Sequence, residues 1–198
     1  MRTQLLHTVT RFLILGVLIA LVPAASADAA TYEVDGVHSS ALFKVKHFGA
    51  SNFYGAFREI TGSINYDSAM PEGMGIEVEI AAASVDTRYE QRDNHVKSPD
   101  FLNAAEFPTI KFKSTSVSMN DDGTFSVTGN LTLHGVTKEI QVTAEKVGEA
   151  EHPRSGKQLI GFEAKFTVDR TEFDMAFMAG PLSEEVEFMI SLEASPGS

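Results

Sequence analysis

Apolar and polar residues alternate with a period of two along most of this chain. Residues 76–80 (Ile-Glu-Val-Glu-Ile) show the pattern most simply, with acidic residues between apolar ones. Because successive side chains of a β-strand point to opposite faces, this alternation predicts strands with one buried and one solvated face. The chain is therefore predicted to be all-β. The same pattern recurs at residues 41–45, 110–112, 125–127, 140–142, 160–168 and 186–192.

Turn-forming residues separate these segments and indicate how many strands there are. Pro71-Glu72-Gly73, Asp121-Asp122-Gly123 and residues 151–156 mark three of the turns. We expect about eight strands from the number of alternating runs and the turns between them. A sheet of that size commonly closes on itself, which removes its unpaired edges. The predicted fold is a single antiparallel eight-stranded barrel.

One stretch, near residues 88–105, departs from the alternation. Residues 87–90 (Thr-Arg-Tyr-Glu) have the spacing of a capping box, which predicts a short helix over residues 88–96. Ser98-Pro99 is typical of a second helix start, with serine as the cap and proline in the first turn. We expect this helical insertion to cover one mouth of the barrel.

The first residues carry the features of an export signal. Residues 12–22 form an uninterrupted apolar run of eleven residues. As a helix this run would span about 17 Å, well short of the roughly 30 Å of a bilayer core. Ala25-Ser26-Ala27 then offers the small residues that a signal peptidase accepts. We predict a cleaved signal peptide at residues 1–27, with a cut after Ala29 or an uncleaved anchor as the alternatives.

Cleavage would leave an acidic, cysteine-free protein in the periplasm or outside the cell, with no stable membrane anchor. Residues 28–198 form one predicted domain, because no linker or repeat interrupts them. They keep 14 of the 16 basic residues and all 27 acidic ones, for a net charge of −13. Such a chain is not expected to bind nucleic acid or anionic lipid surfaces. Without cysteine, its stability must come from packing and strand pairing.

The interior of the predicted barrel could be filled or hollow. An eight-stranded barrel is just wide enough for its own side chains or for one slender ligand. Past residue 27 the chain has 13 phenylalanines, six methionines and no tryptophan. Phenylalanine and methionine line adaptable apolar cavities, but they also build ordinary cores. Composition alone leaves both alternatives open.

Short motifs are spread in order over nearly all of residues 28–198. They are residues 35–40 (DGVHSS), 43–49 (FKVKHFG), 55–57 (GAF), 85–87 (VDT), 92–96 (RDNHV), 98–101 (SPDF), 107–108 (FP), 129–138 (GNLTLHGVTK) and 169–173 (DRTEF). In this order they resemble the YceI-like polyisoprenoid-binding family. Two positions depart from the family pattern: Asp174 stands where glycine is usual, and Leu102 where a second aromatic is frequent. Both are expected near the ligand mouth.

The resemblance implies an extended lipocalin-like barrel that encloses an isoprenoid lipid, such as an isoprenoid quinone, as a ligand rather than a cofactor. A true lipocalin is disfavoured because its hallmark tryptophan is missing. We expect storage or transfer of the lipid, and we leave a homodimer open. The inward faces of the strands would line an apolar tunnel with Phe43, Val45, Phe57, Ile110, Phe112, Phe162, Phe166, Phe173, Met175, Phe188 and Ile190.

A set of polar residues in the same motifs is predicted to meet the ligand headgroup at one mouth. A mostly apolar pocket fixes the orientation of its ligand with a few polar contacts. The alternative is that these residues form structural ion pairs and turn hydrogen bonds, with the histidines on the surface. The set comprises His38, His47, Arg92, Asp93, His95 and Arg170.

Two other classes of function are weighed against lipid binding. One is an envelope stress-related interaction protein with a side-chain-filled barrel. The other is a metal-dependent enzyme in which His38 and His47 approach each other and His95 or His134 completes a zinc set, although these spacings match no compact ligand pattern. No Gly-x-Ser-x-Gly elbow is present. We therefore predict a binding protein, not an enzyme, and no metal site.

Overall fold

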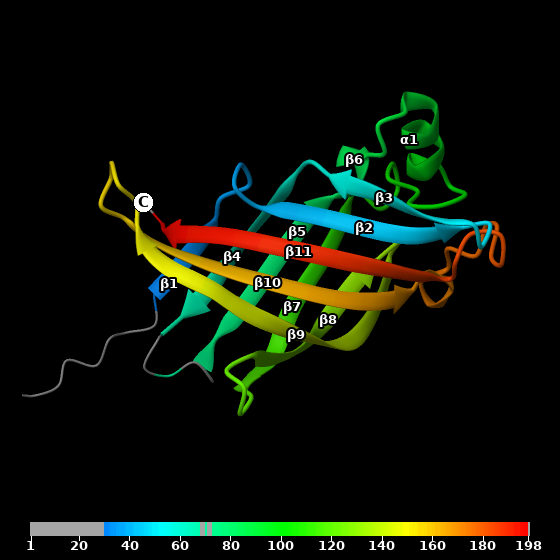
Figure 1. The fold of residues 1–198 in the computed structure, drawn as a ribbon. Helices are drawn as coiled ribbons and strands as arrows, with labels where there is room; N and C mark the ends of the chain where they lie inside the picture. Colours follow the sequence, from blue (N-terminus) through cyan, green and yellow to red (C-terminus); the bar gives the residue numbers. More distant parts are fainter. Residues whose placement is uncertain (1–29, 68–69, 71–72, 198) are drawn as a thin grey trace, which may run out of the picture.

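The computed structural model describes residues 30–67, 70 and 73–197. Within these ranges the strands form one antiparallel sheet, with one α-helix and short 3₁₀ turns beside it (Figure 1). The strands are β1 (Ala30–Val34), β2 (Ser40–His47), β3 (Ser51–Phe57), β4 (Ile60–Tyr66), β5 (Gly75–Ala81), β6 (Val85–Asp86), β7 (Thr109–Met119), β8 (Phe125–Leu133), β9 (Val136–Glu151), β10 (Gln158–Asp169) and β11 (Glu185–Pro196). The helices are α1 (Glu90–Lys97), η2 (Ala82–Ser84) and η3 (Arg170–Phe173).

Eight of the strands close into a barrel. Their order is β1-β4-β5-β7-β8-β9-β10-β11, and β1 also pairs with β11 to complete the ring. This closed antiparallel barrel confirms the predicted fold class. Closure pairs most edges of the ring, as expected for a sheet of this size, although residues 136–143 of β9 lie beyond the last β9–β10 pair, Ala144 with Ala164.

The other three strands extend one end of the barrel. β1 pairs with the C-terminal end of β11, and β2 pairs with Glu187–Ser191 of the same strand. β1 and β2 therefore share one edge of β11. β3 then pairs with β2, and β6 pairs with β3. The extension lies at the same end as α1 (Figure 1). The sequence did not predict β1, β3, β4 or β6. Glycine interrupts the apolar alternation of β3 and β4, and β1 and β6 are only five and two residues long.

The alternation in β5 is confirmed residue by residue. Val78 and Ile80 are buried, whereas Glu77 and Glu79 face solvent and pair with lysines of β7. The Glu79–Lys111 and Glu77–Lys113 distances are 2.5 and 2.9 Å. These exposed pairs contribute little to stability, because solvent screens them. Burial of the apolar face is therefore the main reason why this segment forms a strand.

Aromatic side chains fill the end of the barrel away from α1. The ring of Phe162 lies 5.7 Å from that of Tyr66 and 6.0 Å from that of Phe125, both in edge-on geometry. Nearby, Ile64, Val127 and Ile160 are almost completely buried. These packed rings close this end of the barrel beyond Phe162.

The predicted helical insertion is present, but its two sequence signals were wrong in detail. α1 has no side-chain cap: Thr87 instead donates from its amide and Oγ1 to Asp93 Oδ1, at 2.6 and 2.5 Å. The expected second helix does not form, and residues 98–106 make successive turns. Ser98 ends α1, since its Oγ donates to the carbonyl of His95. Within the described ranges, no helix is long and apolar enough to cross a membrane.

The β8–β9 turn should tolerate no side chain at Gly135. His134 and Gly135 both have positive φ, 52° and 76°, and a Cβ at Gly135 would lie 2.5 Å from the Phe107 ring. We expect Gly135→Ala to lower the free energy of unfolding by about 2 kcal/mol in urea denaturation. Gly148→Ala is the control, because a Cβ there meets no atom within 4 Å. Equal losses in the two variants would contradict this account of the turn.

Candidate ligand-binding site

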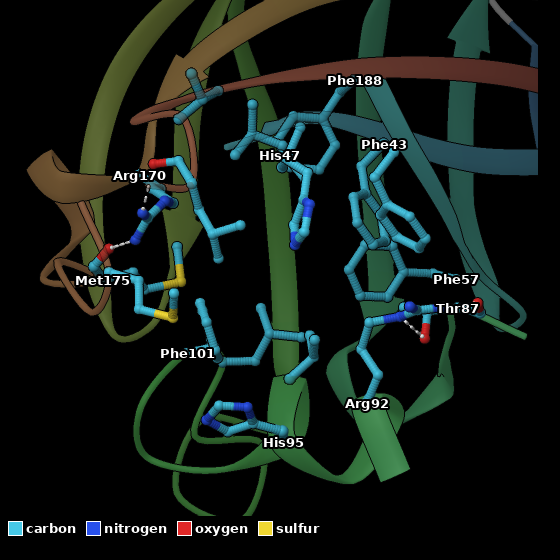
Figure 2. A pocket seen from close by; sticks show the side chains of 18 of the residues that line it. Phe43, His47, Phe57, Thr87, Arg92, His95, Phe101, Arg170, Met175 and Phe188 are labelled. Atoms are coloured by element: carbon cyan, nitrogen blue, oxygen red, sulfur yellow. Dashed lines mark hydrogen bonds between the residues drawn. The ribbon is translucent and has the colours of Figure 1, made fainter. Parts of the chain in front are cut away.

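A cavity of about 410 Å³ occupies the extended end of the barrel. Its wall comes from β2, β3, β7, β8, β10 and β11, together with α1 and the loops that follow α1 and η3. Figure 2 shows Phe43 and Phe57 on one side of the cavity and Arg170 and Met175 on the other. A cavity of this size, lined mainly by apolar side chains, is typical of small-molecule sites.

Phe43 and Phe57 form an aromatic wall, and a glycine makes room for it. Their ring centroids are 5.6 Å apart. Gly55 lies beneath the Phe43 ring: a Cβ at this position would be 2.2 Å from Phe43 Cζ. The glycine of the GAF motif therefore lets the Phe43 ring lie flat against β3. Any larger residue there would push the ring into the cavity.

Arg92 is held rigidly at the edge of the cavity. Its Nε donates to Thr87 Oγ1 at 2.9 Å, and its Nη2 donates to the carbonyl of Thr87 at 2.6 Å. The guanidinium lies over the Phe53 ring, 4.3 Å from its centroid. Asp93 Oδ1 accepts the hydrogen bonds from the Thr87 amide and hydroxyl, and Asp93 does not line the cavity. The structure thus makes Asp93 a brace for Thr87, which in turn orients Arg92.

Arg170 lines the cavity, but its donors bind the loop between η3 and β11. It is 5% exposed. Its guanidinium donates to the carbonyls of Met175, Phe177, Leu182 and Ser183. Burial lowers the pKa of Arg170, while the charges of Glu184 and Asp169 oppose that shift. An arginine nevertheless remains protonated at ordinary pH. Its role in the described structure is to fold this loop against the barrel.

Two histidines also belong to the polar part of the lining, which includes Ser51 and Asn52. His95 Nε2 is 2.8 Å from Asp100 Oδ2, and the His95 ring packs edge-on against Phe101 and Phe177 at 5.1 and 5.5 Å. His47 points into the cavity from the end of β2 (Figure 2). Four of the six residues predicted to meet the headgroup therefore line one cavity: His47, Arg92, His95 and Arg170.

A second cavity, of about 90 Å³, lies deeper in the barrel. It shares Ile110, Leu133 and Phe188 with the first cavity. These three side chains therefore form a partition between the two spaces. The Phe188 ring is stacked on that of Phe166, with 5.4 Å between centroids. The apolar interior thus continues past the partition toward the aromatic end of the barrel.

Most of the residues predicted to contact lipid do line these cavities. Phe43, Val45, Phe57 and Met175 line the larger one, Phe112, Phe162, Phe166 and Ile190 line the smaller one, and Ile110 and Phe188 line both. Phe173 lines neither and is buried at 2% exposure in η3.

Sequence reasoning missed residues that lie outside the alternating runs. Phe53 sits on β3, opposite Val45 in the register, so pairing with the predicted β2 strand could have revealed it. Phe101 was singled out only as part of a motif. Leu182 lies outside the named strands, where no periodic signal marks an inward side chain. Leu102, which was expected near the ligand mouth because it departs from the family pattern, does line the larger cavity.

His38 lies away from the cavities, in the connection between β1 and β2. Its Nδ1 is 2.9 Å from Asp35 Oδ2 and 3.7 Å from Glu193 Oε1. The Asp35 hydrogen bond raises the pKa of His38, and His38 in turn lowers the pKa of Asp35. Asp35 also accepts from the Val37 amide at 2.8 Å. These bonds brace a turn, so His38 does not join the other headgroup candidates.

The zinc arrangement considered from the sequence does not form. β2 separates His38 from His47 by roughly 23 Å of extended chain. Among the described residues, Asp35, His38 and Glu193 are the group of possible metal ligands whose atoms lie within 4.8 Å of one another. All three side chains are partly solvent-exposed, and the hydrogen bonds of Asp35 and His38 already explain their positions.

The fold and cavity define a lipocalin-like β-barrel of the ligand-binding kind. A model of the YceI-like domain matches residues 32–194, and the chain belongs to that family. It is 42% identical over 176 residues to a UPF0312 protein of Azotobacter vinelandii, covering 88% of this chain and 91% of that one.

Solved structures share the fold. BcnA of Burkholderia cenocepacia superposes with a TM-score of 0.74 at 20% identity, covering 81% of this chain and 99% of that one. A polyisoprenoid binding domain from Saccharophagus degradans gives a TM-score of 0.65 at 14% identity, over 86% and 100% of the two chains. At these identities the likeness establishes the architecture.

Arg170→Ala should loosen the loop between η3 and β11. Four carbonyls would lose a charged donor in a buried setting, so we expect the free energy of unfolding to fall by about 3 kcal/mol in urea denaturation. Amide exchange should also rise over residues 174–184. Arg154→Ala, at an exposed hairpin position, is the control and should change stability by less than about 0.5 kcal/mol. An unchanged exchange rate in the loop would contradict the role assigned to Arg170.

Proposed function

We propose that this protein encloses the hydrocarbon tail of an isoprenoid lipid, such as an isoprenoid quinone, for storage or transfer in the periplasm or outside the cell. The observation that carries the proposal is the apolar cavity of about 410 Å³ with a smaller cavity directly behind it. An interior with this much space favours lipid binding over the side-chain-filled barrel of the alternative. The polyisoprenoid binding domain that shares the fold supports the same class of ligand.

The arrangement of the cavity suits a long apolar molecule with a polar end. The aromatic and aliphatic walls would take the tail, since burial is worth about 25 cal/mol for each Å² of apolar surface removed from water. His47, Arg92 and His95 lie around the larger cavity and would meet the headgroup. No covalent step is needed, and the proposed activity is binding and release.

Mass spectrometry of an organic extract tests this function. The protein is expressed with its leader and purified from the envelope fraction. We expect close to one isoprenoid molecule for each protein chain. An extract without isoprenoid, from protein with a normal β-sheet circular dichroism spectrum, would overturn the proposal and favour an interaction protein.

A cavity-filling variant makes the same test specific to the site. Val45→Trp places a large ring in the larger cavity and should reduce lipid retention at least about tenfold. Val147→Trp is the matched control, because Val147 is 63% exposed on β9 and lines neither cavity. Equal retention in the two variants would place the lipid elsewhere.

The partition should set the length of tail that fits. Phe188→Ala removes the largest of its three side chains and should join the two cavities. We expect the ratio of affinities for geranylgeraniol over farnesol to rise several-fold in a fluorescence competition assay. Phe125→Ala is the control, since Phe125 is equally part of the core but lines neither cavity. An unchanged ratio in Phe188→Ala would show that the tail does not reach the partition.

A further inference from the structure

Two loops at the mouth of the larger cavity are joined into a single rim, comprising residues 47–50 and 175–183. The Phe48 amide donates to the Pro181 carbonyl at 2.7 Å. The Ser183 amide donates to the Lys46 carbonyl at 3.0 Å, and the Lys46 amide donates to Ser183 Oγ at 2.9 Å. Both loops lie at the extended end of the barrel (Figure 1). The rim is therefore an ordered part of the fold.

The rim exposes large apolar side chains beside the cavity. Phe48 is 57% exposed, Phe177 is 40% exposed and Met178 is 37% exposed. Met178 also lines the cavity, and the Phe177 ring packs against that of the lining residue Phe101 at 5.4 Å. Phe177 and Met178 therefore link the exposed side of the rim to the cavity wall. Exposed apolar surface of this kind marks interaction sites.

The rim carries no formal charge in a chain that is otherwise rich in charges. Residues 47–57 and 175–183 contain no Asp, Glu, Lys or Arg, although such residues make up 22% of the sequence. The acidic remainder of the chain would be repelled by an anionic surface. The rim is therefore a surface through which a neutral bilayer can be contacted without desolvating a charged side chain.

The backbone holds two of the exposed side chains in an uncommon conformation. Phe48 and Met178 have φ angles of 49° and 51°. Positive φ is strained for residues with large side chains. Strain of this kind is concentrated at functional sites. Met178 lines the cavity, but Phe48 does not, so packing around the cavity does not explain why phenylalanine occupies position 48.

We propose that the rim docks on a lipid bilayer, with Phe48, Phe177 and Met178 entering the interfacial region. This inference rests on the proposed function, because the cavity mouth would then face the source of an isoprenoid tail. Apolar and aromatic side chains bind the interface in proportion to the apolar area that they bury. The tail would pass between bilayer and cavity along Phe177 and Met178, without crossing water.

Flotation with vesicles of phosphatidylcholine and phosphatidylethanolamine tests the docking. We expect the wild-type protein to float with the vesicles and Phe48→Asn to reduce the bound fraction at least about tenfold. Asparagine tolerates positive φ, so this variant should keep its fold and its thermal stability. Met119→Asn is the matched control, because Met119 is 54% exposed at the end of β7, away from the rim. The control should float like the wild type.

Binding of farnesol in vesicle-free buffer separates docking from ligand binding. Phe48 is absent from the cavity lining, so Phe48→Asn should keep its farnesol affinity within about twofold of wild type. Wild-type protein that binds farnesol but not vesicles would overturn the docking and leave the proposed function standing. Vesicle binding without any isoprenoid binding would overturn the function instead. If the protein is a dimer that Phe48→Asn dissociates, and vesicle binding is absent, the rim is an interface between copies and the docking proposal fails.

Discussion

The barrel depends on how β11 divides one edge between two strands. β1 pairs with the C-terminal end of β11 and closes the ring through β4, whereas β2 pairs with Glu187–Ser191 and leads into the extension. The chain bends between β1 and β2, and Asp35 braces the bend with its bonds to Val37 and His38. Both strands run antiparallel to β11, but they differ in the partner on their other edge, which is β4 for β1 and β3 for β2.

The extension creates the space for a ligand. Aromatic side chains close one end of the ring beyond Phe162, whereas β2 and β3 extend the opposite end and add Phe43, Val45 and Phe57 to the cavity wall. α1 and the loop after η3 then enclose that space. Arg170 fixes this loop through backbone carbonyls, so the same contact that shapes the cavity wall also supports the rim. Cavity, rim and fold are therefore consequences of one arrangement of strands.

The sequence predicted the site well where it lies on long strands and poorly elsewhere. Phe43, Phe166 and Phe188 were identified because a period of two assigns each side chain to a face. Phe173 broke that rule, since it falls in a 3₁₀ turn and packs into the core instead. His38 was grouped with His47 by motif, but His38 precedes β2 and His47 is its last residue, so the length of the strand lies between them. Proximity in sequence does not establish proximity in an extended chain.

The sequence by itself determined the all-β barrel, the acidic character of the protein and its family, because alternation, charge and motifs can be read directly from the order of the residues. Only the tertiary structure decided that the interior is partly hollow, since the same phenylalanines could have filled it. It also decided which polar residues face the cavity and which brace turns. These outcomes depend on strand register and loop packing, which join residues far apart in the chain and leave no periodic mark in the sequence.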